Sequence, residues 1–394
     1  MLSHLIKLMW NKRRANGMIF LEVLLAFIVL FGVYAFGLYN LDRYNSPLGF
    51  SYDNSLGVRV DLQDDLDSAS VMLLHDRIRR EILDIPGVAE ATWLGPVNPF
   101  GGSTWFTSND EKGFDIMTGL VFADEHFAST AELKMREGRW YRPEDQRGKY
   151  LPIVVNGAFY DEYYPDATTL IDTIFDLYGG EHIVVGVVDE FKYRSNFAER
   201  EPISFLSHGD MDPEEDGAFQ QLIVRTDPGR LADVEEPLYR TLVDLANTSD
   251  VVIWNMAQDR IKANRPIVIP LVILIAIPAF LLINIALGLF GVLFTQINRR
   301  RAEIGLRKAM GATPVEVTTQ FVLEILIVTA AGLLLGVFFA VQVPLLELLP
   351  IPERFFYLGI AAAIVTIVLI VVLCALIPSR QAARLHPALV LHEE

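Results

Sequence analysis

Two carboxylates stand inside otherwise apolar stretches of the sequence, where an ionisable side chain is costly to hold. Glu22 lies in the first and Glu324 in the third of four long apolar runs. Such a residue is a default candidate for ion passage, a proton relay or a conformational switch. Both lie near the basic ends of their runs, within reach of side chains such as Arg14 or Arg299, and no further ionisable residue continues a path. We therefore expect structural pairing, with a part in a conformational switch as the alternative.

No other pattern of reactive residues supports catalysis or metal binding. The sequence contains no G-x-x-x-x-G-K-[ST] phosphate loop, and GATPVEVT (311–318) lacks the lysine and the second glycine of that motif. The seven histidines show neither HExxH nor another zinc spacing. The acidic stretch HGDMDPEEDG (208–217) departs from the EF-hand loop, because Glu215 replaces the glycine. Nothing resembles a nucleophile elbow. We expect a chain that is not an enzyme and that itself binds no metal or cofactor.

The overall composition indicates membrane spans combined with one large water-exposed part. The chain has 394 residues, of which 52% are hydrophobic, and a formal net charge of −16. So negative a chain is a poor partner for nucleic acid. The single cysteine, Cys374, excludes an intrachain disulfide.

Four apolar runs are each long enough to cross the roughly 30 Å hydrocarbon core of a bilayer. A cleavable signal peptide ending near Ala35 is the alternative for the first run, but its apolar stretch is longer than the usual h-region. We expect an uncleaved first span, preceded by an amphipathic cytoplasmic segment over 1–17. The expected spans cover residues 18–39, 267–295, 317–343 and 355–378.

Basic residues set the expected orientation of these spans. Lysines and arginines are concentrated in the N-terminal segment, in 299–313 and in the tail 379–394, whereas the loop between the last two spans has only Arg354. The positive-inside rule then places both termini and the 299–313 segment in the cytoplasm, and residues 40–265 outside.

The outer segment, residues 40–265, contains strand and helix patterns but no apolar run of spanning length. Strand-like runs between polar turns predict strands at LGVRVDL, LPIVVN, HIVVGVV and QQLIVRT. Helical patterns at 68–84 and 229–247 are each followed by another strand candidate, which gives one β-α-β unit early and one late. Two such halves predict a split βαβ domain, with an antiparallel sheet and helices on one face, interrupted by an insert at about 113–200. The expected fold class is a membrane protein with four transmembrane α-helices, one plus three, and a large α+β extracytoplasmic domain between spans 1 and 2.

A basic, amphipathic segment, RRRAEIGLRKAMGATPVEV (299–317), separates the second and third runs. In a helix, four apolar side chains of this segment share one face, with the charged side chains off that face. These four are Ala302, Leu306, Ala309 and Met310.

The end of the same segment carries turn and capping residues. Gly311 suits the left-handed conformation that ends a helix. Thr313, Pro314 and Glu316 then form a capping box with proline at the first helical position, which starts the next helix. On these grounds alone, a membrane-surface anchor with positive-inside charge remains an open alternative.

The quoted segment closely resembles the cytoplasmic signature of the MacB/FtsX-type ABC transporter permeases, the type VII or mechanotransmission family. The terminal IPSRQAARLHPALVLHEE resembles the ending of members of that family. In the outer segment, LKMREGRWYRPED, IVVNGAFYDEYYPD and HIVVGVVDEFKYRSNF resemble three family stretches in the family's order. The order of the spans, one plus three with a large loop after the first, matches as well.

The resemblance implies a coupling role for the basic segment. In the family, this helix docks into a separate cytoplasmic ATPase subunit, which binds ATP and Mg²⁺, and two permease chains, like or unlike, assemble with two ATPase subunits. The residues implied for ATPase coupling are Ala302, Glu303, Ile304, Leu306, Arg307, Lys308, Met310, Gly311, Ala312 and Thr313.

The resemblance also implies a location and a mode of action. The chain is expected in a bacterial inner membrane, with its large domain periplasmic and built as a porter-like subdomain with a sabre-like insert. ATP binding and release are expected to drive the outer domains together and apart, with no substrate passing between the spans. The bilayer and a periplasmic adaptor or lipoprotein complete the expected partners.

Two pairs of small residues in the last spans allow close helix packing. They are Gly332 with Gly336, and Gly359 with Ala363. Such spacing lets two helix backbones approach one another. Packing within one chain and contact across a dimer are both open.

Two other classes of function compete with the transporter. An FtsX-like regulator would activate an extracytoplasmic cell-wall hydrolase, but the outer segment is large for that branch of the family. A membrane-anchored ectoenzyme lacks a candidate site and leaves the basic segment without a purpose.

Overall fold

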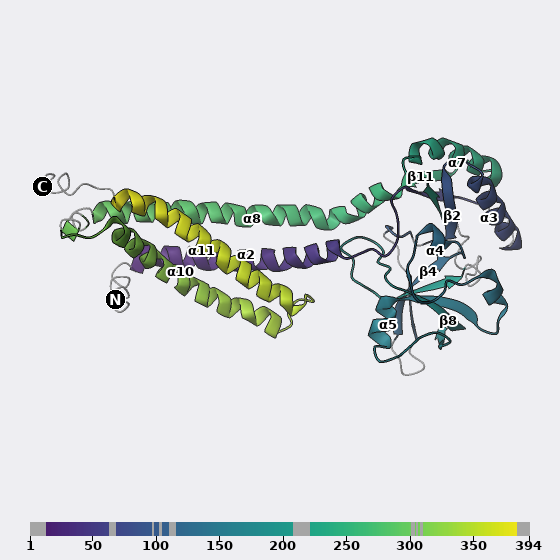
Figure 1. Cartoon of the computed structure of the whole chain (residues 1–394), viewed down its shortest axis with the longest axis horizontal. Coiled ribbons are helices and arrows are strands. Elements are labelled where there is room, and N and C mark those ends of the chain that lie inside the picture. The colour runs from purple at the N-terminus through teal and green to yellow at the C-terminus, as the bar shows by residue number, and fades with distance from the viewer. Residues whose placement is uncertain are drawn as a thin grey trace. The chain divides into compact units, whose positions relative to one another are not determined.

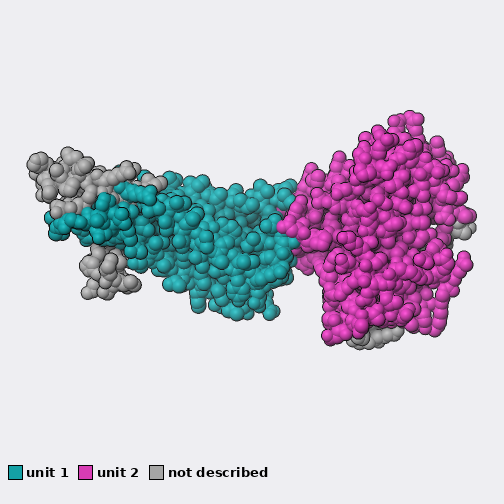
Figure 2. All heavy atoms as spheres, viewed as in Figure 1, with its two compact units in different colours: residues 1–42, 268–394 teal, residues 43–267 magenta. Residues whose placement is uncertain are grey.

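The computed structural model describes residues 13–62, 68–96, 98–101, 105–109, 116–207, 221–300, 304, 306–307 and 310–383. The amphipathic segment expected before residue 13, the acidic stretch 208–217 and the tail from residue 384 lie outside the described residues. The chain divides into two compact units, residues 1–42 with 268–394, and residues 43–267 (Figure 2). Each unit is described by itself.

Four helices of the described chain are long and apolar enough to cross a membrane. Each contains one of the four apolar runs of the sequence and extends beyond it, because polar residues at the ends still continue the helical hydrogen bonds. The helices are α2 (Arg13–Asn45), α8 (Met256–Arg299), α10 (Pro314–Leu345) and α11 (Glu353–Ala383) (Figure 1).

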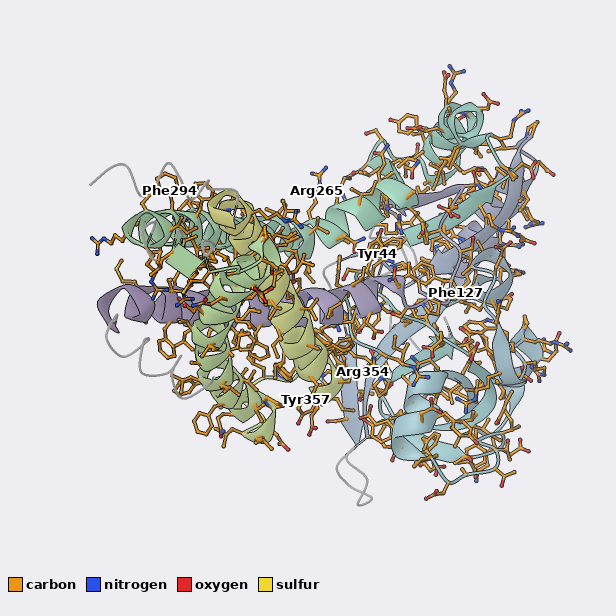
Figure 3. The ribbon with its side chains drawn as sticks, turned by 60° about the vertical axis from the view of Figure 1, so that its left-hand side comes forward. Tyr44, Phe127, Arg265, Phe294, Arg354 and Tyr357 are labelled. Carbon is orange, nitrogen blue, oxygen red and sulfur yellow. The ribbon has the colours of Figure 1, made fainter. Side chains whose placement is uncertain are left out.

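The membrane helices pack around one apolar core. Phe27 of α2 and Leu289 of α8 are fully buried in it, as are Ala363 and Ile367 of α11. Large apolar side chains also lie on the outer faces, where Leu334 is 73% exposed. A helix that is apolar all round suits a lipid environment. At the α11 start, Arg354 (labelled in Figure 3) donates from Nη2 to Asp42 Oδ2 of α2 at 2.9 Å.

The other unit is built on one mixed sheet, in which eleven strands are found among the described residues, in the order β11-β1-β10-β2-β4-β9-β6-β8-β5 with β3 beside β4 and β7 beside β8. The strands are β1 (Ser55–Val60), β2 (Val88–Leu94), β3 (Trp105–Asn109), β4 (Ile116–Ala123), β5 (Met135–Gly138), β6 (Leu151–Asn156), β7 (Ile174–Leu177), β8 (Gly180–Val188), β9 (Ile203–Ser207), β10 (Gln221–Thr226) and β11 (Val251–Asn255). The helices are α3 (Ser68–Leu83), α4 (Phe127–Thr130), α5 (Gly157–Tyr163) and α7 (Leu231–Ala246), with a 3-10 turn at Pro143–Arg147.

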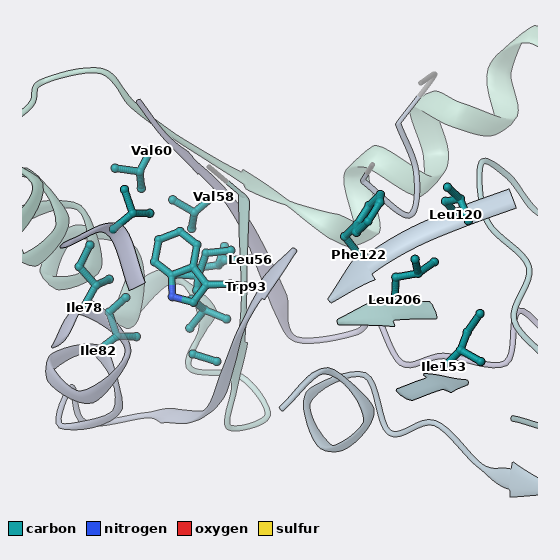
Figure 4. Packing of buried hydrophobic residues seen from close by; sticks show 14 of the residues in the cluster. Leu56, Val58, Val60, Ile78, Ile82, Trp93, Leu120, Phe122, Ile153 and Leu206 are labelled. Atoms are coloured by element: carbon teal, nitrogen blue, oxygen red, sulfur yellow. The ribbon is translucent and has the colours of Figure 1, made fainter. Parts of the chain in front are cut away.

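The first four strands in that order come from two interleaved halves. The β1-α3-β2 unit and the β10-α7-β11 unit each leave a gap of one strand, and the other half fills it, so all three pairings are antiparallel. Both helices cover the same face, where Ile78 and Ile82 of α3 and Leu238 and Leu242 of α7 are fully buried. Figure 4 shows the two isoleucines packed near Trp93 of β2.

The second part of the sheet lies between β2 and β10 in the chain. It joins the first part through a single register pair, Leu94 with Ala123, and its β4–β9 and β6–β8 pairings are parallel. It is larger than the expected insert at 113–200, since β3 and β9 lie outside those bounds and pair with β4 and β6. The pairing of distant strands, which sequence alternation does not reveal, decides where this part begins and ends.

Alternation along the strands divides the buried residues between two faces of the sheet. In β4, Leu120 and Phe122 belong to the cluster beneath the helices, whereas Val121 and Ala123 belong to the opposite cluster. The opposite cluster is rich in aromatic rings, among them Phe127, whose centroid lies 6.0 Å from that of Phe191 (Phe127 is labelled in Figure 3). A sheet covered on both faces requires this two-residue period.

Candidate functional site

The segment between α8 and α10, residues 299–313, is called the coupling segment below. Its described residues continue helical hydrogen bonding past α8, because Ile304 N donates to Arg300 O at 2.9 Å and Met310 N donates to Leu306 O at 3.0 Å. Ala302, Glu303 and Lys308, which the sequence also proposed for this site, lie outside the described residues, as does Ala309.

One apolar side chain anchors the coupling segment to the bundle. Ile304 is 4% exposed and packs with Ile297 of α8 and with Val317 and Phe321 of α10, with the partly buried Ala312 beside them. Leu306 and Met310, the described members of the apolar face that the sequence predicted, do not pack against the bundle. Leu306 is 55% exposed and Met310 is 73% exposed. The segment therefore has a buried side that holds it and an exposed apolar side.

The turn into α10 has the capping geometry that the sequence indicated. Gly311 has φ +99°, in the left-handed region that L side chains rarely adopt, with no neighbour within 4 Å of an added Cβ. Thr313 Oγ1 accepts from Glu316 N at 3.3 Å, and Glu316 Oε2 accepts from Thr313 N at 2.9 Å. With Pro314 at the first helical position, the bend is fixed by local chemistry.

The carboxylate of Glu324 is paired with the coupling segment. Arg300 Nη1 donates to its two oxygens at 3.1 and 3.2 Å, so the partner is Arg300 rather than the Arg14 or Arg299 considered from the sequence. Gln320 Nε2 also donates to Glu324 Oε1 at 3.2 Å. Arg307 Nη1 donates to Gln320 Oε1 at 2.6 Å, which extends the network into the segment. Arg300 rather than its neighbour Arg299 reaches Glu324, because the rotation of the helix about its axis decides which side chain faces α10. Proximity in the sequence does not determine this rotation.

The other intramembrane carboxylate, Glu22, lies against a glycine. A Cβ added at Gly288 of α8 would lie 2.9 Å from Glu22 Oε2, so the missing side chain makes room for the carboxylate. No hydrogen bond or ion pair joins Glu22 to any residue that the structure describes. The pairing that the sequence suggested is thus found at Glu324 but not at Glu22 within the described chain.

The small residues of the last two spans pack against α2 of the same chain. A Cβ added at Gly336 would lie 2.4 Å from Phe27 Cδ1, and one added at Gly332 would lie 3.1 Å from Phe20 O. A Cβ added at Gly359 would lie 2.9 Å from Ala35 N, and Ala363 is fully buried. Of the two uses considered from the sequence, packing within one chain is the one these contacts support.

A loop in the outer unit holds the last residues of α2. Residues 191–199, called the clasp loop below, contain Lys192, which is 4% exposed and donates from Nζ to Arg43 O at 2.6 Å and to Ser46 Oγ at 2.7 Å. A lysine that donates to a carbonyl at the end of a helix satisfies an acceptor the helix leaves open. The ring of Phe197 also lies 5.4 Å from that of Tyr44, which Figure 3 labels.

The same loop holds the first turns of α8. Asn196 N donates to Asn264 Oδ1 at 3.0 Å, and Asn264 Nδ2 donates to Asn196 Oδ1 at 2.9 Å. Both side chains are buried. In the sequence, FKYRSNF was identified only as part of a stretch that resembles the family. Its role at α2 could not be predicted, because the sequence around Lys192 does not show which distant carbonyl accepts its hydrogen bond.

A buried aspartate joins the two parts of the sheet. Asp124, 8% exposed, accepts hydrogen bonds from Thr92 Oγ1, from Trp93 N at 2.8 Å and from His126 N at 2.9 Å. Burial raises the pKa of Asp124 to about 6, although these donors favour the charged form. Because Thr92 and Trp93 belong to β2, this carboxylate reinforces the junction between β2 and β4.

Comparisons with known proteins agree with this arrangement. The FtsX-like permease C-terminal family matches residues 275–387, which include the later part of α8, the coupling segment, α10 and α11. Macrolide export ATP-binding/permease protein MacB 1 of Yersinia pestis is 23% identical over 336 residues, covering 83% of this chain and 50% of that protein. YvrN of Bacillus subtilis, an uncharacterized ABC transporter permease, is 24% identical over 280 residues, or 67% of each chain.

Solved structures give a more distant likeness. The periplasmic region of MacB from Actinobacillus actinomycetemcomitans covers 55% of this chain at 12% identity, with 95% of its own length aligned and a TM-score of 0.37. A score of that size does not establish a shared fold. The chain spans about half the length of the MacB relatives that it matches. The FtsX-like match, the MacB and YvrN similarities and the presence of four membrane helices together with an α+β unit support its assignment to the MacB/FtsX-type ABC transporter permeases.

Proposed function

We propose that this chain is a permease subunit that converts ATP hydrolysis on a separate ATPase subunit into movement of its extracytoplasmic domain. ATP and Mg²⁺ are held by that partner, and the coupling segment is the surface that docks into it. The observation that carries the proposal is the two-sided coupling segment. Ile304 is buried against α8 and α10, whereas Leu306 and Met310 present large apolar side chains with nothing described covering them.

Leu306 and Met310 expose apolar side chains in the connection between α8 and α10. A contiguous apolar surface outside a membrane core stabilises binding to another protein, since burying it removes it from water. The attachment must also be stiff to pass on movement. The cluster around Ile304, the Arg300–Glu324 ion pair and the capped turn at Thr313 together fix the segment to the ends of two spans.

The wider assembly follows from the same proposal. The coupling segment and both chain ends lie in the cytoplasm of a bacterial inner membrane, and residues 43–267 lie in the periplasm. Two permease chains, like or unlike, assemble with the ATPase subunits. A periplasmic adaptor or a lipoprotein is the partner proposed for the outer domain, whose movement does the work.

The clasp loop supports the outer half of the proposed transmission. Because Lys192 bonds to the end of α2 and Asn196 to the first turns of α8, one loop is hydrogen-bonded to both helices inside the outer unit. A displacement of either helix end is therefore transferred to the sheet through hydrogen bonds rather than through a loose linker.

The first experiment is purification of the full chain in mild detergent with identification of the co-eluting proteins. We expect an ATPase that carries a Walker motif, and its hydrolysis rate should depend on the permease. Leu306→Ala with Met310→Ala should abolish that dependence while leaving the melting temperature of the chain unchanged, because both side chains are exposed.

A matched control removes the same two side-chain types elsewhere. Met72 and Leu73 of α3 are 48% and 70% exposed in the outer unit, so Met72→Ala with Leu73→Ala should leave ATPase stimulation intact. Unchanged stimulation in the Leu306/Met310 variant would show that the segment is a membrane anchor only. Recovery of a cell-wall hydrolase in place of an adaptor or cargo would favour the regulatory alternative.

A further inference from the structure

Strand β11 leaves one edge of the sheet open. Within the described chain, β11 pairs with β1 alone, and the pairing continues one step further, where Asp61 N donates to Asp250 O at 3.1 Å. Antiparallel partners hydrogen-bond at alternate residues. Val252 therefore bonds to β1, whereas Val251 and Ile253 direct their N–H and C=O groups to the open edge. These groups have no hydrogen-bond partner among the described residues.

In the described part of the chain, this edge carries no lysine, proline or bulge that would prevent strand addition. Natural edge strands are commonly blunted by lysine, proline, a bulge or a covering element. β11 reads VVIWN, and its register with β1 runs without a shift from Val251 to Asn255. Val252 is 42% exposed on one face of this strand. An edge of regular register that is rich in β-branched residues is suited to pairing with another extended chain.

A groove runs beside the open edge, between the strand and α7. It has a volume of about 450 Å³ and is lined by Ala232, Glu235, Glu236 and Tyr239 of α7 and by Ile253 of β11. Ile253 thus contributes both its backbone to the edge and its side chain to the groove. The side chains of a strand added at this edge would alternate, with every second one directed into the groove.

The groove combines apolar and acidic surface. Ala232, Ile253 and the ring of Tyr239, which is 41% exposed, give it an apolar part. Glu236 pairs with Arg240 at 2.5 Å, whereas Glu235 has no ion pair among the described residues. A carboxylate at the rim of an apolar groove favours a ligand with an aliphatic stem and a positive end.

We propose that β11 and this groove bind an extended, basic segment of a partner protein. The segment adds to the sheet beside β11, exchanging main-chain hydrogen bonds with Val251 and Ile253. It lays one lysine or arginine stem across Tyr239 and brings the charged end to Glu235. Main-chain bonds supply affinity and the groove supplies selectivity, as in other cases of strand addition.

A second copy of this chain fits the same edge poorly. Two β11 strands related by a twofold axis would each bring Asp250 and the carboxylates of α7 toward the same acidic surface of the other copy. Like charges placed together across an interface disfavour it. The strand itself, VVIWN, offers no basic side chain to Glu235. The charge of the groove therefore selects a partner of different sequence.

The test uses the full chain in lipid nanodiscs and a fluorescent, end-blocked peptide of alternating valine and lysine. Its control is the same peptide with every amide N-methylated, which removes the donors along both strand edges without changing the charge or the side chains. Fluorescence anisotropy should show binding of the first peptide and about tenfold weaker binding of the second. Equal binding of the two peptides would overturn strand addition.

Variants of the chain locate the site. Glu235→Lys should weaken binding about tenfold, because it reverses the charge that meets the peptide. Asp244→Lys makes the same change at an exposed position of α7 outside the groove, and it should leave binding unchanged. Val251→Pro, which removes an outward N–H at an edge position that tolerates proline, should abolish binding. Equal effects of the two lysine substitutions would refute the groove as the site.

The oligomeric state separates the two occupants. Light scattering of the chain in detergent should show the same oligomeric state for the wild type and for Val251→Pro, because β11 does not pair with a second copy. If the wild-type chain does self-associate through this edge, and the basic peptide fails to compete, the occupant is a second copy and the proposal is wrong. The ATPase measurement proposed above is unaffected by either result, since no residue of this groove belongs to the coupling segment.

Discussion

Arg300 and Glu324 form an ion pair between the coupling segment and α10, with Nη1 lying 3.1 Å from Oε1. The two side chains are 14% and 12% exposed, so each charge is largely removed from water. A buried charge is tolerated where its partner is held in place, and losing that partner is costly. The pair therefore fixes the direction of the coupling segment relative to the span that follows it.

Breaking this pair should loosen the coupling segment. We expect Glu324→Gln to lower the stability of the membrane unit by about 3 kcal/mol, because it removes the carboxylate charge that faces the largely buried Arg300 guanidinium. Thermal unfolding in detergent and ATPase stimulation should both fall. The exchanged variant, Arg300→Glu with Glu324→Arg, should recover part of each.

A second ion pair of the same unit serves as the control. Arg354 and Asp42 have side chains that are 64% and 53% exposed, and exposed pairs contribute little to stability. Asp42→Asn should therefore leave both measurements unchanged. An equal loss in Asp42→Asn and Glu324→Gln would mean that burial does not decide the strength of the Arg300 pair.

Close packing of α10 on α2 should fail when a side chain is added at Gly336. An added Cβ would lie 2.4 Å from Phe27 Cδ1, and Phe27 is fully buried, so the ring or the helix must shift. We expect Gly336→Ala to cost about 2 kcal/mol. Gly291→Ala, on α8 with no neighbour within 4 Å, should be tolerated. Phe27→Leu combined with Gly336→Ala should melt higher than Gly336→Ala alone.

Protonation of Asp124 should change the stability of the junction between β2 and β4. Its pKa is about 6 in the folded chain, against an ordinary value of 3.8, so the folded state binds the proton more tightly than the unfolded state. The contribution of this group to stability is then fully present below pH 3.8 and is lost as the pH rises through about 6.

Hydrogen exchange provides a local measurement of that effect. Amides of β2 and β4 in the wild-type chain should be protected more strongly at pH 5 than at pH 7, after correction for intrinsic exchange. Asp124→Asn should remove this pH dependence and weaken protection at both values, because its NH₂ group faces the donors of Trp93 or His126. A pH dependence that survives the substitution would have to come from another group.

The clasp loop should lose its hold on α2 when Lys192 becomes methionine. Lys192→Met keeps the apolar stem but removes the donors to Arg43 O and Ser46 Oγ, which should cost about 2 kcal/mol. We expect faster amide exchange in the last turn of α2. ATPase stimulation should persist while the nucleotide-dependent change in the outer domain, followed by a pair of spin labels, is reduced. Lys262→Met removes a 61% exposed lysine and should change neither signal.

A double-mutant cycle isolates the other half of the clasp loop. Asn196→Ala removes the side-chain bond from Asn264 Nδ2 to Asn196 Oδ1 but keeps the backbone donor Asn196 N, whereas Asn264→Ala removes both bonds. Since the two residues bond directly, their effects should be non-additive by about 1 kcal/mol. Additive effects on amide exchange in the first turns of α8 would contradict direct transmission through this pair.

Features with a local cause could be predicted from the sequence. Apolar runs of spanning length gave the four membrane helices, because bilayer thickness acts on each run separately. Short apolar runs between polar turns predicted β1, β6, β8 and β10, since β-branched residues and turn residues act on each strand separately. The capping box at Thr313 was equally readable, because its hydrogen bonds join residues three apart.

Tertiary structure decided the contacts between residues far apart in the chain. That Arg300 rather than Arg299 reaches Glu324, and that Ile304 is buried while the described Leu306 and Met310 are exposed, depends on how α8 and α10 are rotated against one another. That Lys192 meets Arg43 depends on a loop closing over 149 residues. Sequence patterns record the period and polarity of one element, whereas the partner of each side chain is set by packing among several elements at once.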